Sequence, residues 1–571
     1  MLRHSFVILA IVLVSSWVMS ACPEKQEKKP PIQTQAPSEE TKVTNQINKT
    51  LIRALVAEPH NLNPVLSFDV YSGDVQRLIF NPLLSIDSSP NSILVGRLAE
   101  RWEISADKKT ITFFLRPGIT WHDGEPFSAE DVKFTFDAPL REDIPSPSIK
   151  SLFDILSHVE VMDEHTIAFH FKYAFSPGIS KFIGVQIIPK HCLDEQALAR
   201  ETKRRGLEKP VTFMTSSFNR HPIGTGPYIF QEWETAQHIK LKHNQNYWDK
   251  KHVPHIEHIM LKIIPKPTVA FNIMQKGELH VLRVLPEQYM QFKRLHHLHQ
   301  DYVALRFYRP VYYFIAWNQR PEKKFFTERR IRQAMTHALD RKAFIEKVNY
   351  GMGKILSGPF YFQSWAYNPH IQAIPFDLEK AAELIQAAGW KDHDNNGIID
   401  KNGVQFEFEL LIPSGRQIYA QLAQLIQASL KDMNINVLIR VYEWSVFLEK
   451  TRQREFDAYI AGISLDVDPD PYELFHSSQI NEGMNDFGYA NKKVDKLIAA
   501  GRQEFDQTKR QKIYWEIHKI INEDQPCTFI YTPMDIYILS KKIENVQVSP
   551  FGLFRFFPGQ LSWSFTENQG R

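Results

Sequence analysis

The fold class is decided by residues 419–441, which read YAQLAQLIQASLKDMNINVLIRV. The first part of this stretch has apolar residues at the spacing of a helix, namely Leu422, Leu425, Ile426, Leu430 and Met433. The last part, residues 436–441, is a short apolar run typical of a buried strand. A helix that leads directly into a strand is the building unit of parallel sheets covered by helices. We therefore predict an α/β fold, in which ligands bind at the ends of strands or between lobes.

The rest of the chain supports this prediction. Strand-like alternation occurs in residues 110–115 and 166–171, and helical spacing occurs in residues 331–339. Of the 571 residues, 43% are hydrophobic and 23% are charged, which excludes a disordered chain. The 68 Lys and Arg residues and the 65 Asp and Glu residues leave a formal charge of only +3. Because this charge is small for so large a surface, no nucleic-acid partner is expected.

The first 50 residues predict an export signal followed by a tether. A basic residue, Arg3, precedes an apolar run, residues 6–18, that is too short to span a membrane, so we expect a signal peptide over residues 1–21. The tetrad MSAC resembles a bacterial lipobox and predicts a lipid on Cys22; an ordinary signal peptide with a chance cysteine is the alternative. Residues 22–50 are polar and rich in proline, and we expect a disordered tether that holds the folded body outside the cytoplasmic membrane.

Motifs of common enzymes are absent from the sequence. It contains no GxGxxG, GxxxxGK(S/T), GxSxG or HExxH pattern. A site built from dispersed residues remains the alternative, but we expect a protein that is not an enzyme. Beyond Cys22, only Cys192 and Cys527 remain, and the sequence leaves open whether they form a disulfide or two free thiols.

One loop has the spacing of a calcium site of the EF-hand type. Its positions 1, 3, 5 and 9 carry oxygen side chains, which are Asp392, Asp394, Asn396 and Asp400. Position 12 is Gly403 instead of the usual Glu, so a calcium site and a turn held by Asx hydrogen bonds are both kept as interpretations. No other cofactor is expected. Two groups of histidines, in residues 252–258 and 296–299, are interpreted as solvated loop residues, with a transition-metal site as the alternative.

A series of motifs runs in order through the body of the chain. The motifs are NPLL at residues 81–84, LAERWEIS at 98–105, FLRPGITWHDGEPFSAEDV at 114–132, GTGPY at 224–228, NYW at 246–248, RIRQA at 330–334, AGW at 388–390 and DPD at 468–470. This series resembles the family 5 extracellular solute-binding proteins, which are the oligopeptide, dipeptide and nickel receptors of ABC importers. The resemblance covers nearly all of the chain after the tether.

Most of these motifs also have a structural explanation. HDG at residues 122–124 is typical of a tight turn, and Ser128 and Asp131 have the positions of a helix N-cap and of the acidic residue that completes a capping box. The two glycines of GTGPY favour a sharp turn. We expect these motifs to hold the fold rather than to contact a ligand.

The resemblance implies an α/β fold of the two-lobed periplasmic-binding-protein type, type II-like with an extra domain, in which the ligand cleft lies between the lobes. The expected ranges are residues 51–88, 220–305 and 536–571 for lobe I, residues 89–219 for the extra domain inserted in it, and residues 306–535 for lobe II.

The resemblance also implies a receptor that captures peptides outside the cytoplasmic membrane and delivers them to an ABC permease by closing its lobes. The expected partners are peptides, the permease subunits and, through the lipid, the membrane; the receptor itself is expected to be a monomer. A receptor for a nickel or other metal chelate, or for another small solute, is the alternative within the family, and a secreted enzyme on the same scaffold is a more distant one.

Four residues are the ligand contacts that the resemblance implies. Asp466 falls on the family position whose Asp pairs with the peptide α-ammonium group, and Arg416 falls where dipeptide-binding relatives carry an Arg for the peptide carboxylate. Trp317 and Asn318 are expected to line the cleft. The alternatives are a solvated acidic turn at Asp466, a surface position for Arg416, and core packing for the aromatic residues around Trp317.

Overall fold

The computed structural model describes residues 49–67, 69–90, 92–144, 155–481 and 483–566, which form one compact unit. The expected signal peptide, Cys22 and nearly all of the tether lie outside the described residues. Within the described ranges, no helix has both the length and the apolar character that crossing a bilayer requires.

The helix and the strand predicted from residues 419–441 are both present. α12 (Gln417–Lys431) buries Leu422, Ile426 and Leu430 in a hydrophobic core. β18 (Asn436–Tyr442) follows and pairs in parallel with β17 (Glu407–Pro413). A parallel pair of strands joined by a helix confirms the predicted α/β unit.

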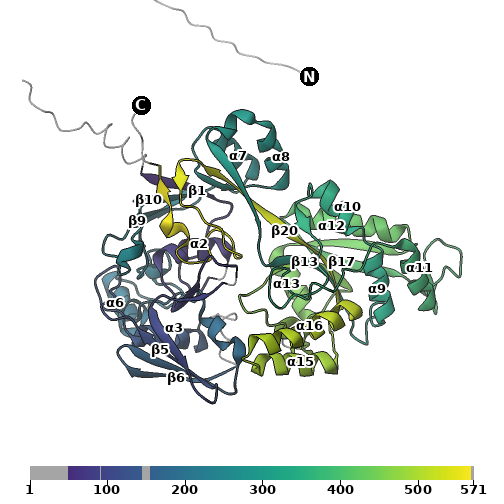
Figure 1. Cartoon of the computed structure of the whole chain (residues 1–571), viewed down its shortest axis with the longest axis horizontal. Coiled ribbons are helices and arrows are strands. Elements are labelled where there is room, and N and C mark those ends of the chain that lie inside the picture. Colours follow the sequence, from purple (N-terminus) through teal and green to yellow (C-terminus); the bar gives the residue numbers. More distant parts are fainter. Residues whose placement is uncertain (1–48, 68, 91, 145–154, 482, 567–571) are drawn as a thin grey trace, which may run out of the picture. The chain divides into compact units, whose positions relative to one another are not determined.

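One mixed sheet runs through both lobes of the protein. Its strands follow the order β18-β17-β19-β13-β20-β11-β1-β10-β9-β8, and β12 and β14 also pair with β20. We call the part around β1 and β8 to β12 lobe I, and the part around β13 and β17 to β19 lobe II. The strand β20 (Cys527–Ser540) passes from one lobe to the other (Figure 1).

Lobe I combines strands from three separate parts of the sequence. Its elements are β1 (Thr50–Leu55), α2 (Val70–Ile79), β8 (Tyr228–Glu234), β9 (His238–His243), η4 (Lys250–His252), β10 (His258–Ile263), α7 (Pro267–Gln275), β11 (Val281–Arg283), α8 (Pro286–Arg294), η5 (His296–His299), β12 (Tyr302–Tyr308), β21 (Ile543–Glu544), η8 (Gly559–Ser562) and β22 (Ser564–Phe565). β1 lies between β10 and β11 and pairs in parallel with both.

A second sheet, with the order β4-β5-β7-β6, lies beside the strands of lobe I (Figure 1), and we count it and the elements around it as part of that lobe. The elements of this region are β2 (Leu84–Ile86), β3 (Leu94–Gly96), β4 (Ala99–Ile104), β5 (Thr110–Leu115), α3 (Ala129–Asp137), η1 (Ala138–Leu140), β6 (Leu156–Asp163), β7 (Thr166–Phe171), η2 (Ser176–Phe182), α5 (Lys190–Leu193), α6 (Glu195–Arg204) and η3 (Ser217–Asn219). β5 and β7 coincide with the two strands predicted from alternation. Side chains between residues 83 and 187 form the core of this sheet, whereas Leu193, Leu198 and Phe213 pack into the core of lobe I.

Lobe II contains most of the helices in the second half of the chain. Its elements are β13 (Val311–Trp317), α9 (Arg329–His337), α10 (Arg341–Ala343), η6 (Phe344–Val348), β14 (Gly353–Lys354), α11 (Leu378–Ala387), β15 (Asp400–Lys401), β16 (Val404–Gln405), β17, α12, β18, α13 (Trp444–Gln453), β19 (Ala458–Ser464), α14 (Tyr472–Phe475), η7 (Ser477–Gln479), α15 (Lys492–Gln503) and α16 (Gln507–Asp524). Two hydrophobic cores cover the two faces of its sheet: Phe408 and Leu410 contribute to one, and Leu411 and Phe456 to the other.

The crossing strand β20 changes its partners where it leaves lobe II. It pairs with β13 as far as Tyr531 and with β12 from Met534 onward. Asp535, which is only 3% exposed, lies at this crossing and forms ion pairs with Arg283 and Arg309. Burial raises the pKa of Asp535, but the two guanidinium groups outweigh it and hold the pKa below its ordinary value. The crossing therefore keeps a buried, ionised carboxylate.

The motifs at residues 122–132 and 224–228 support the fold as predicted. Ser128 and Asp131 form a capping box at the start of α3. The His122 ring accepts a hydrogen bond from the Gly224 N–H at Nδ1 (3.2 Å) and donates one from Nε2 to the Gly226 carbonyl (2.9 Å). A Cβ on Gly226 would lie 2.4 Å from the backbone of Ile79, so only glycine fits there. These motifs join the second sheet to lobe I.

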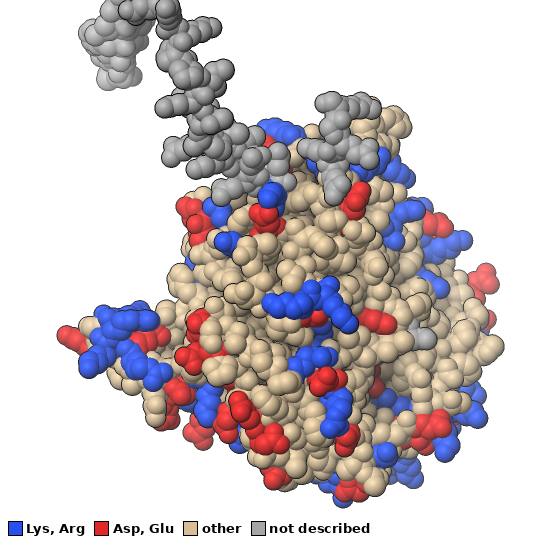
Figure 2. Space-filling model, turned by 60° about the vertical axis from the view of Figure 1, so that its left-hand side comes forward, with Lys and Arg blue, Asp and Glu red and all other residues tan. Residues whose placement is uncertain are grey.

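Charged side chains of both signs are intermixed on one face of the protein. On the face drawn in Figure 2, basic and acidic side chains alternate, and uncharged surface separates them. This distribution agrees with the formal charge of +3. Among the described residues of this face, the mixture of signs leaves no extended positive patch (Figure 2).

Candidate ligand-binding site

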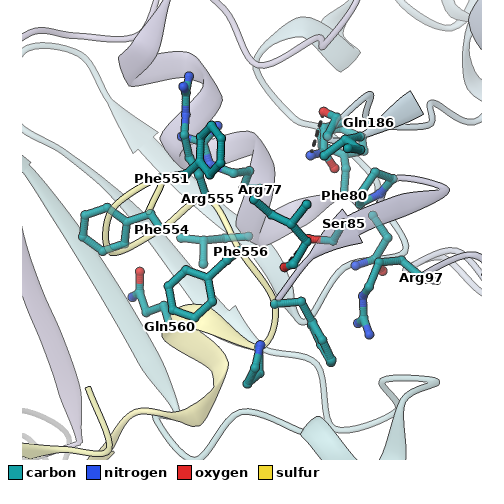
Figure 3. Close-up of a pocket in the computed structure, with 18 of the residues that line it drawn as sticks. Arg77, Phe80, Ser85, Arg97, Gln186, Phe551, Phe554, Arg555, Phe556 and Gln560 are labelled. Atoms are coloured by element: carbon teal, nitrogen blue, oxygen red, sulfur yellow. Dashed lines mark hydrogen bonds between the residues drawn. The ribbon is translucent and has the colours of Figure 1, made fainter. Parts of the chain in front are cut away.

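A cavity of about 300 Å³ lies where the two lobes face each other. Lobe I contributes α2, β2 and residues 551–561 of the C-terminal segment, and lobe II contributes residues 465–467. In Figure 3, Phe554 and Phe556 lie across the cavity from Arg97. Because both lobes contribute to the wall, a ligand held here would contact both of them.

The strand that leads to this cavity has an open edge. β19 pairs along its whole length with β13, but it pairs with β17 only through its first two residues. The Leu465 N–H donates to the carbonyl of Pro310 (2.7 Å), and bonded groups alternate along antiparallel strands, so the backbone groups of Gly462 and Ser464 point to the opposite edge. In the described part of the chain, no other strand pairs with that edge. An edge of this kind can accept an extended peptide as an added strand.

The structure separates the three aspartates that the sequence places close together. Asp468 accepts hydrogen bonds from both terminal nitrogens of Arg510, and Asp470 lies 3.1 Å from Nε of Arg502. Asp466 has no arginine partner among the described residues of lobe II, and its side chain is 76% exposed. Of the three, Asp466 is the one that lines the cavity. Its carboxylate is therefore the one available to a cationic ligand.

Lys181 reaches Asp466 from the other lobe. It lies in η2, and its Nζ is 3.6 Å from Oδ2 of Asp466. Burial lowers the pKa of Lys181, but the surrounding carboxylates, Asp466 first among them, outweigh it and raise the pKa above its ordinary value. The Arg502 guanidinium also lies 4.8 Å from the ring centroid of Phe175, just before η2. The lobes thus touch on this side of the cavity.

Arg416 lies at the start of α12, beside the open edge of β19. Its side chain is exposed and does not line the cavity. The neighbouring Tyr419 lies close to both Arg416 and the strand edge. Burial raises the pKa of Tyr419 to about 12, whereas the charge of Arg416 and a backbone hydrogen bond from Gly462 in β19 lower it. Arg416 is therefore close to the strand edge and separate from the cavity at Asp466.

Trp317 and Asn318 lie inside lobe II. Both have no exposed surface. The Trp317 indole donates to Thr528 Oγ1 (3.0 Å), and the Asn318 amide donates to the carbonyl of Phe456 (2.9 Å). The structure thus does not bring them to the cavity, because their polar groups complete hydrogen bonds within the core.

Sequence reasoning missed a group of arginines on the wall of lobe I. Arg53, Arg77 and Arg555 all line the cavity, and Asp74 lies among them. None of them belongs to a motif used above. The available signal was Arg555 itself, a lone charge within the aromatic run FGLFRFF of residues 551–557.

The loop with calcium spacing brings its carboxylates together. Asp392, Asp394 and Asp400 each place an oxygen within 4.8 Å of the others. The same side chains accept backbone hydrogen bonds, since Asp392 accepts from the N–H groups of Asn396 and Gly397. Among the described residues, the histidines of 252–258 and 296–299 belong to no group able to hold a metal ion. These hydrogen bonds favour the interpretation of an Asx-type turn, and a calcium site stays the alternative interpretation.

The two remaining cysteines do not pair. Cys192 and Cys527 are free thiols, the first partly buried and the second buried. Burial raises the pKa of both, that of Cys192 to about 12. Neither thiol is therefore activated as a nucleophile.

Comparisons with known proteins agree with this geometry. The model of the bacterial extracellular solute-binding proteins, family 5, matches residues 94–486. The chain is 30% identical over 555 residues to the oligopeptide-binding protein AppA of Bacillus subtilis, covering 96% of this chain and 97% of that protein. It is 25% identical over 534 residues to the dipeptide-binding protein of Escherichia coli, covering 89% and 94% of the two chains.

Solved structures resemble it over the same length. The structure of Bacillus subtilis AppA in complex with a nonapeptide gives a TM-score of 0.75 at 29% identity, covering 91% of this chain and 99% of that one. The structure of NikZ from Campylobacter jejuni in complex with Ni(L-His) also gives 0.75, at 24% identity, covering 90% and 99%. Both are two-lobed folds, so the architecture predicted above is confirmed.

Proposed function

Because this chain belongs to the bacterial extracellular solute-binding proteins of family 5, we propose that it captures peptides and delivers them to an ABC import permease. The observation that carries this proposal is the open edge of β19, which runs directly into the exposed carboxylate of Asp466. An extended peptide needs such an edge for its backbone and a carboxylate for its α-ammonium group.

The peptide would bind as one more strand beside Gly462 and Ser464, and its backbone would replace the Tyr419 hydroxyl at the Gly462 N–H. Backbone hydrogen bonds of this kind are independent of the peptide's side chains, so they give affinity without selecting a sequence. Asp466 would pair with the ammonium group at one end. Arg416, beside the same edge, would pair with the carboxylate of the other end, and a guanidinium suits this role because it can donate two parallel hydrogen bonds.

Lobe closure would convert binding into a signal for the permease. A ligand that contacts both lobes stabilises the closed form, and the closed form is the one that the permease recognises. The contact between Lys181 and Asp466 supports closure at the cavity, since it already joins lobe I to lobe II. In this function the protein breaks no bond, so it is a receptor and not an enzyme.

A chelated metal is the second candidate ligand. It is favoured by the similarity of the fold to NikZ in complex with Ni(L-His) and by the arginines of the cavity, which suit the carboxylates of a chelate. The peptide is preferred because the open strand edge offers backbone groups that a small chelate would leave unused.

Export and anchoring complete the proposal. The apolar run of residues 6–18 supports a signal peptide, and the tetrad ending at Cys22 supports a lipid on that cysteine. The receptor would then be a monomer held outside the cytoplasmic membrane by its N-terminal lipid.

Native mass spectrometry of residues 49–571, the compact unit, tests the function. We expect a ladder of bound peptides that are released on denaturation and identified by sequencing, and their lengths would define the cleft. A single non-peptide adduct or a bound metal would contradict the proposal and favour the chelate.

A further inference from the structure

The cavity wall of lobe I carries more positive than negative charge. Asp74 pairs with Arg77 on α2 and lies 3.6 Å from Nη2 of Arg53 on β1. Arg555 has no ion-pair or hydrogen-bond partner among the described residues. Even when Asp466 across the cavity is counted, three guanidinium groups face two carboxylates. A fourth arginine, Arg97, is neutralised by Asp249 at 3.0 Å and does not add to the excess.

Several buried nitrogens around this charge lack a hydrogen-bond acceptor. They are Nη2 of Arg53, Nε of Arg77 and Nε2 of Gln560. Arg53 is 3% exposed and Gln560 is 7% exposed, so water reaches them poorly. Buried donors in native proteins nearly always have a partner. The missing partner is therefore an acceptor, and the excess of guanidinium groups makes a negative one the best fit.

Aromatic side chains lie beside the guanidinium groups. Arg53 lies over the Phe554 ring, with its central carbon 4.2 Å from the centroid. Figure 3 shows Arg77, Arg555 and Phe551 close together on the same side of the cavity. Partial desolvation within the cavity and, after it, the like charge of Arg77 lower the pKa of Arg555 to about 10. An anion between Arg77 and Arg555 would relieve this repulsion.

The cavity also contains the carboxylate that is proposed for the peptide ammonium group. Asp466 and Arg555 line the same cavity and interact electrostatically. A ligand that places its ammonium group at Asp466 therefore brings its next few atoms toward the arginines. Those atoms belong to the first or second residue of a peptide.

We propose that the cavity binds a carboxylate of the captured peptide between Arg77 and Arg555, next to the ammonium group held by Asp466. This inference rests on the proposed peptide function. The carboxylate can come from an Asp or Glu side chain at the first or second position, or from the C-terminus of a dipeptide. In the first case the receptor prefers peptides that are acidic near their N-terminus.

The test compares peptides that differ in one charge. The probes are the C-terminally amidated pentapeptides Glu-Ala-Ala-Ala-Ala and Ala-Glu-Ala-Ala-Ala, each with a Gln counterpart, and the dipeptide Ala-Ala with its amide. Affinities are measured by calorimetry for the wild type, for Arg555→Gln and for the control Arg452→Gln, whose side chain is 74% exposed on α13. Arg555 is solvent-exposed, so the variant should fold, and its thermal unfolding is checked.

We expect at least one Glu pentapeptide to bind wild type about tenfold more tightly than its Gln counterpart, as a charge-assisted hydrogen-bonded pair allows. Arg555→Gln should reduce this ratio to near one and leave the Gln peptides unaffected, whereas Arg452→Gln should keep it. An effect of Arg555→Gln that is confined to free Ala-Ala would assign the carboxylate to the C-terminus.

Two results would overturn the inference. Equal binding of Glu and Gln peptides and of Ala-Ala and its amide, with no effect of Arg555→Gln, would remove the carboxylate site but leave the peptide function standing. Failure of every peptide to bind would remove both.

Discussion

Lys181 of lobe I and Asp466 of lobe II form an ion pair across the cleft, with Nζ and Oδ2 3.6 Å apart. The lysine thus occupies part of the space that a peptide ammonium group would use. It also supplies attraction between the lobes before any ligand binds. The first effect concerns only peptides with a free amino group, whereas the second concerns every peptide, so the two can be measured separately.

Replacing Lys181 by Met should favour peptides with a free amino group. Without the lysine, the Asp466 carboxylate loses a competitor, and the ratio of affinities for a free and an N-acetylated peptide should rise about threefold, the size of an exposed ion pair. Loss of attraction between the lobes would weaken both peptides alike and leave the ratio unchanged. Calorimetric titration of both peptides measures the ratio, and a ratio that falls would contradict the competition.

Replacing Asp466 by Asn should lower the affinity for a free-amino peptide by about tenfold or more, because a charge-assisted pair is lost. Binding of the N-acetylated peptide should not change, and neither should the melting temperature, since the side chain is 76% exposed. Unchanged affinity for the free-amino peptide would show that Asp466 is not the anchor.

Asp468→Asn is the matched control for that experiment. Asp468 and Arg510 are 13% and 6% exposed, and removal of one partner leaves the other charge buried. We expect a loss of about 3 kcal/mol in the free energy of unfolding, measured by denaturant titration. The opposite pattern, with Asp466→Asn destabilised and Asp468→Asn unaffected, would reverse the roles assigned to the two aspartates.

Replacing Arg416 by Ala should weaken a peptide with a free C-terminus about tenfold and leave its amide unchanged. The reason is that only the free carboxylate can accept two hydrogen bonds from the guanidinium group. The measurement is the affinity of both peptides for both proteins. Equal losses for the acid and the amide would count against this pairing.

Acid should destabilise the protein through its buried histidines. Burial lowers the pKa of His518 to about 4. Its ring accepts a hydrogen bond from the Asn368 N–H and forms a second hydrogen bond with Ser357 Oγ. Since the pKa in the unfolded chain is about 6.5, this stability is complete above pH 6.5 and is lost as the pH falls toward 4. His518→Gln should flatten the slope of melting temperature against pH in that window. An unchanged slope would mean that His518 does not titrate there.

Removing calcium should not change the melting temperature of the protein. The backbone N–H groups of Asn396 and Gly397 already donate to the oxygens of Asp392. We expect equal melting temperatures with excess chelator and with millimolar calcium. A rise with calcium, abolished in Asp394→Ala, would instead establish the loop as a calcium site.

Local patterns in the sequence were sufficient for much of the fold. The strands β5 and β7 and the unit of α12 and β18 follow from periodicity, because each buries a regular face. The capping box at Ser128 follows from residue type and spacing. Packing between distant segments could not be predicted in this way. Leu193 and Phe213 lie within the range expected for the inserted domain, yet they pack into the hydrophobic core around the strands of lobe I.

In the binding site too, local motifs could be predicted from the sequence, whereas contacts between distant segments could not. Asp466 could be chosen from its motif, but only the structure distinguishes it from Asp468, because the pairing of Asp468 with Arg510 depends on a helix further along the chain. The cluster of Arg53, Arg77 and Arg555 joins both ends of the folded chain, and no local pattern predicts that. Trp317 misled the prediction because an aromatic residue on a strand has the same local signal in a core as in a cleft.

The crossing strand β20 also restricts how the lobes can move. One continuous ribbon of 14 residues carries hydrogen bonds to β13 in lobe II and to β12 and β11 in lobe I. At Thr532 and Pro533 the strand pairs with the two-residue β14, so twisting there would disturb fewer hydrogen bonds than sliding of one lobe past the other. We therefore expect the lobes to open and close by torsion of β20 at this point, where the ion pairs of Asp535 with Arg283 and Arg309 restrain the strand.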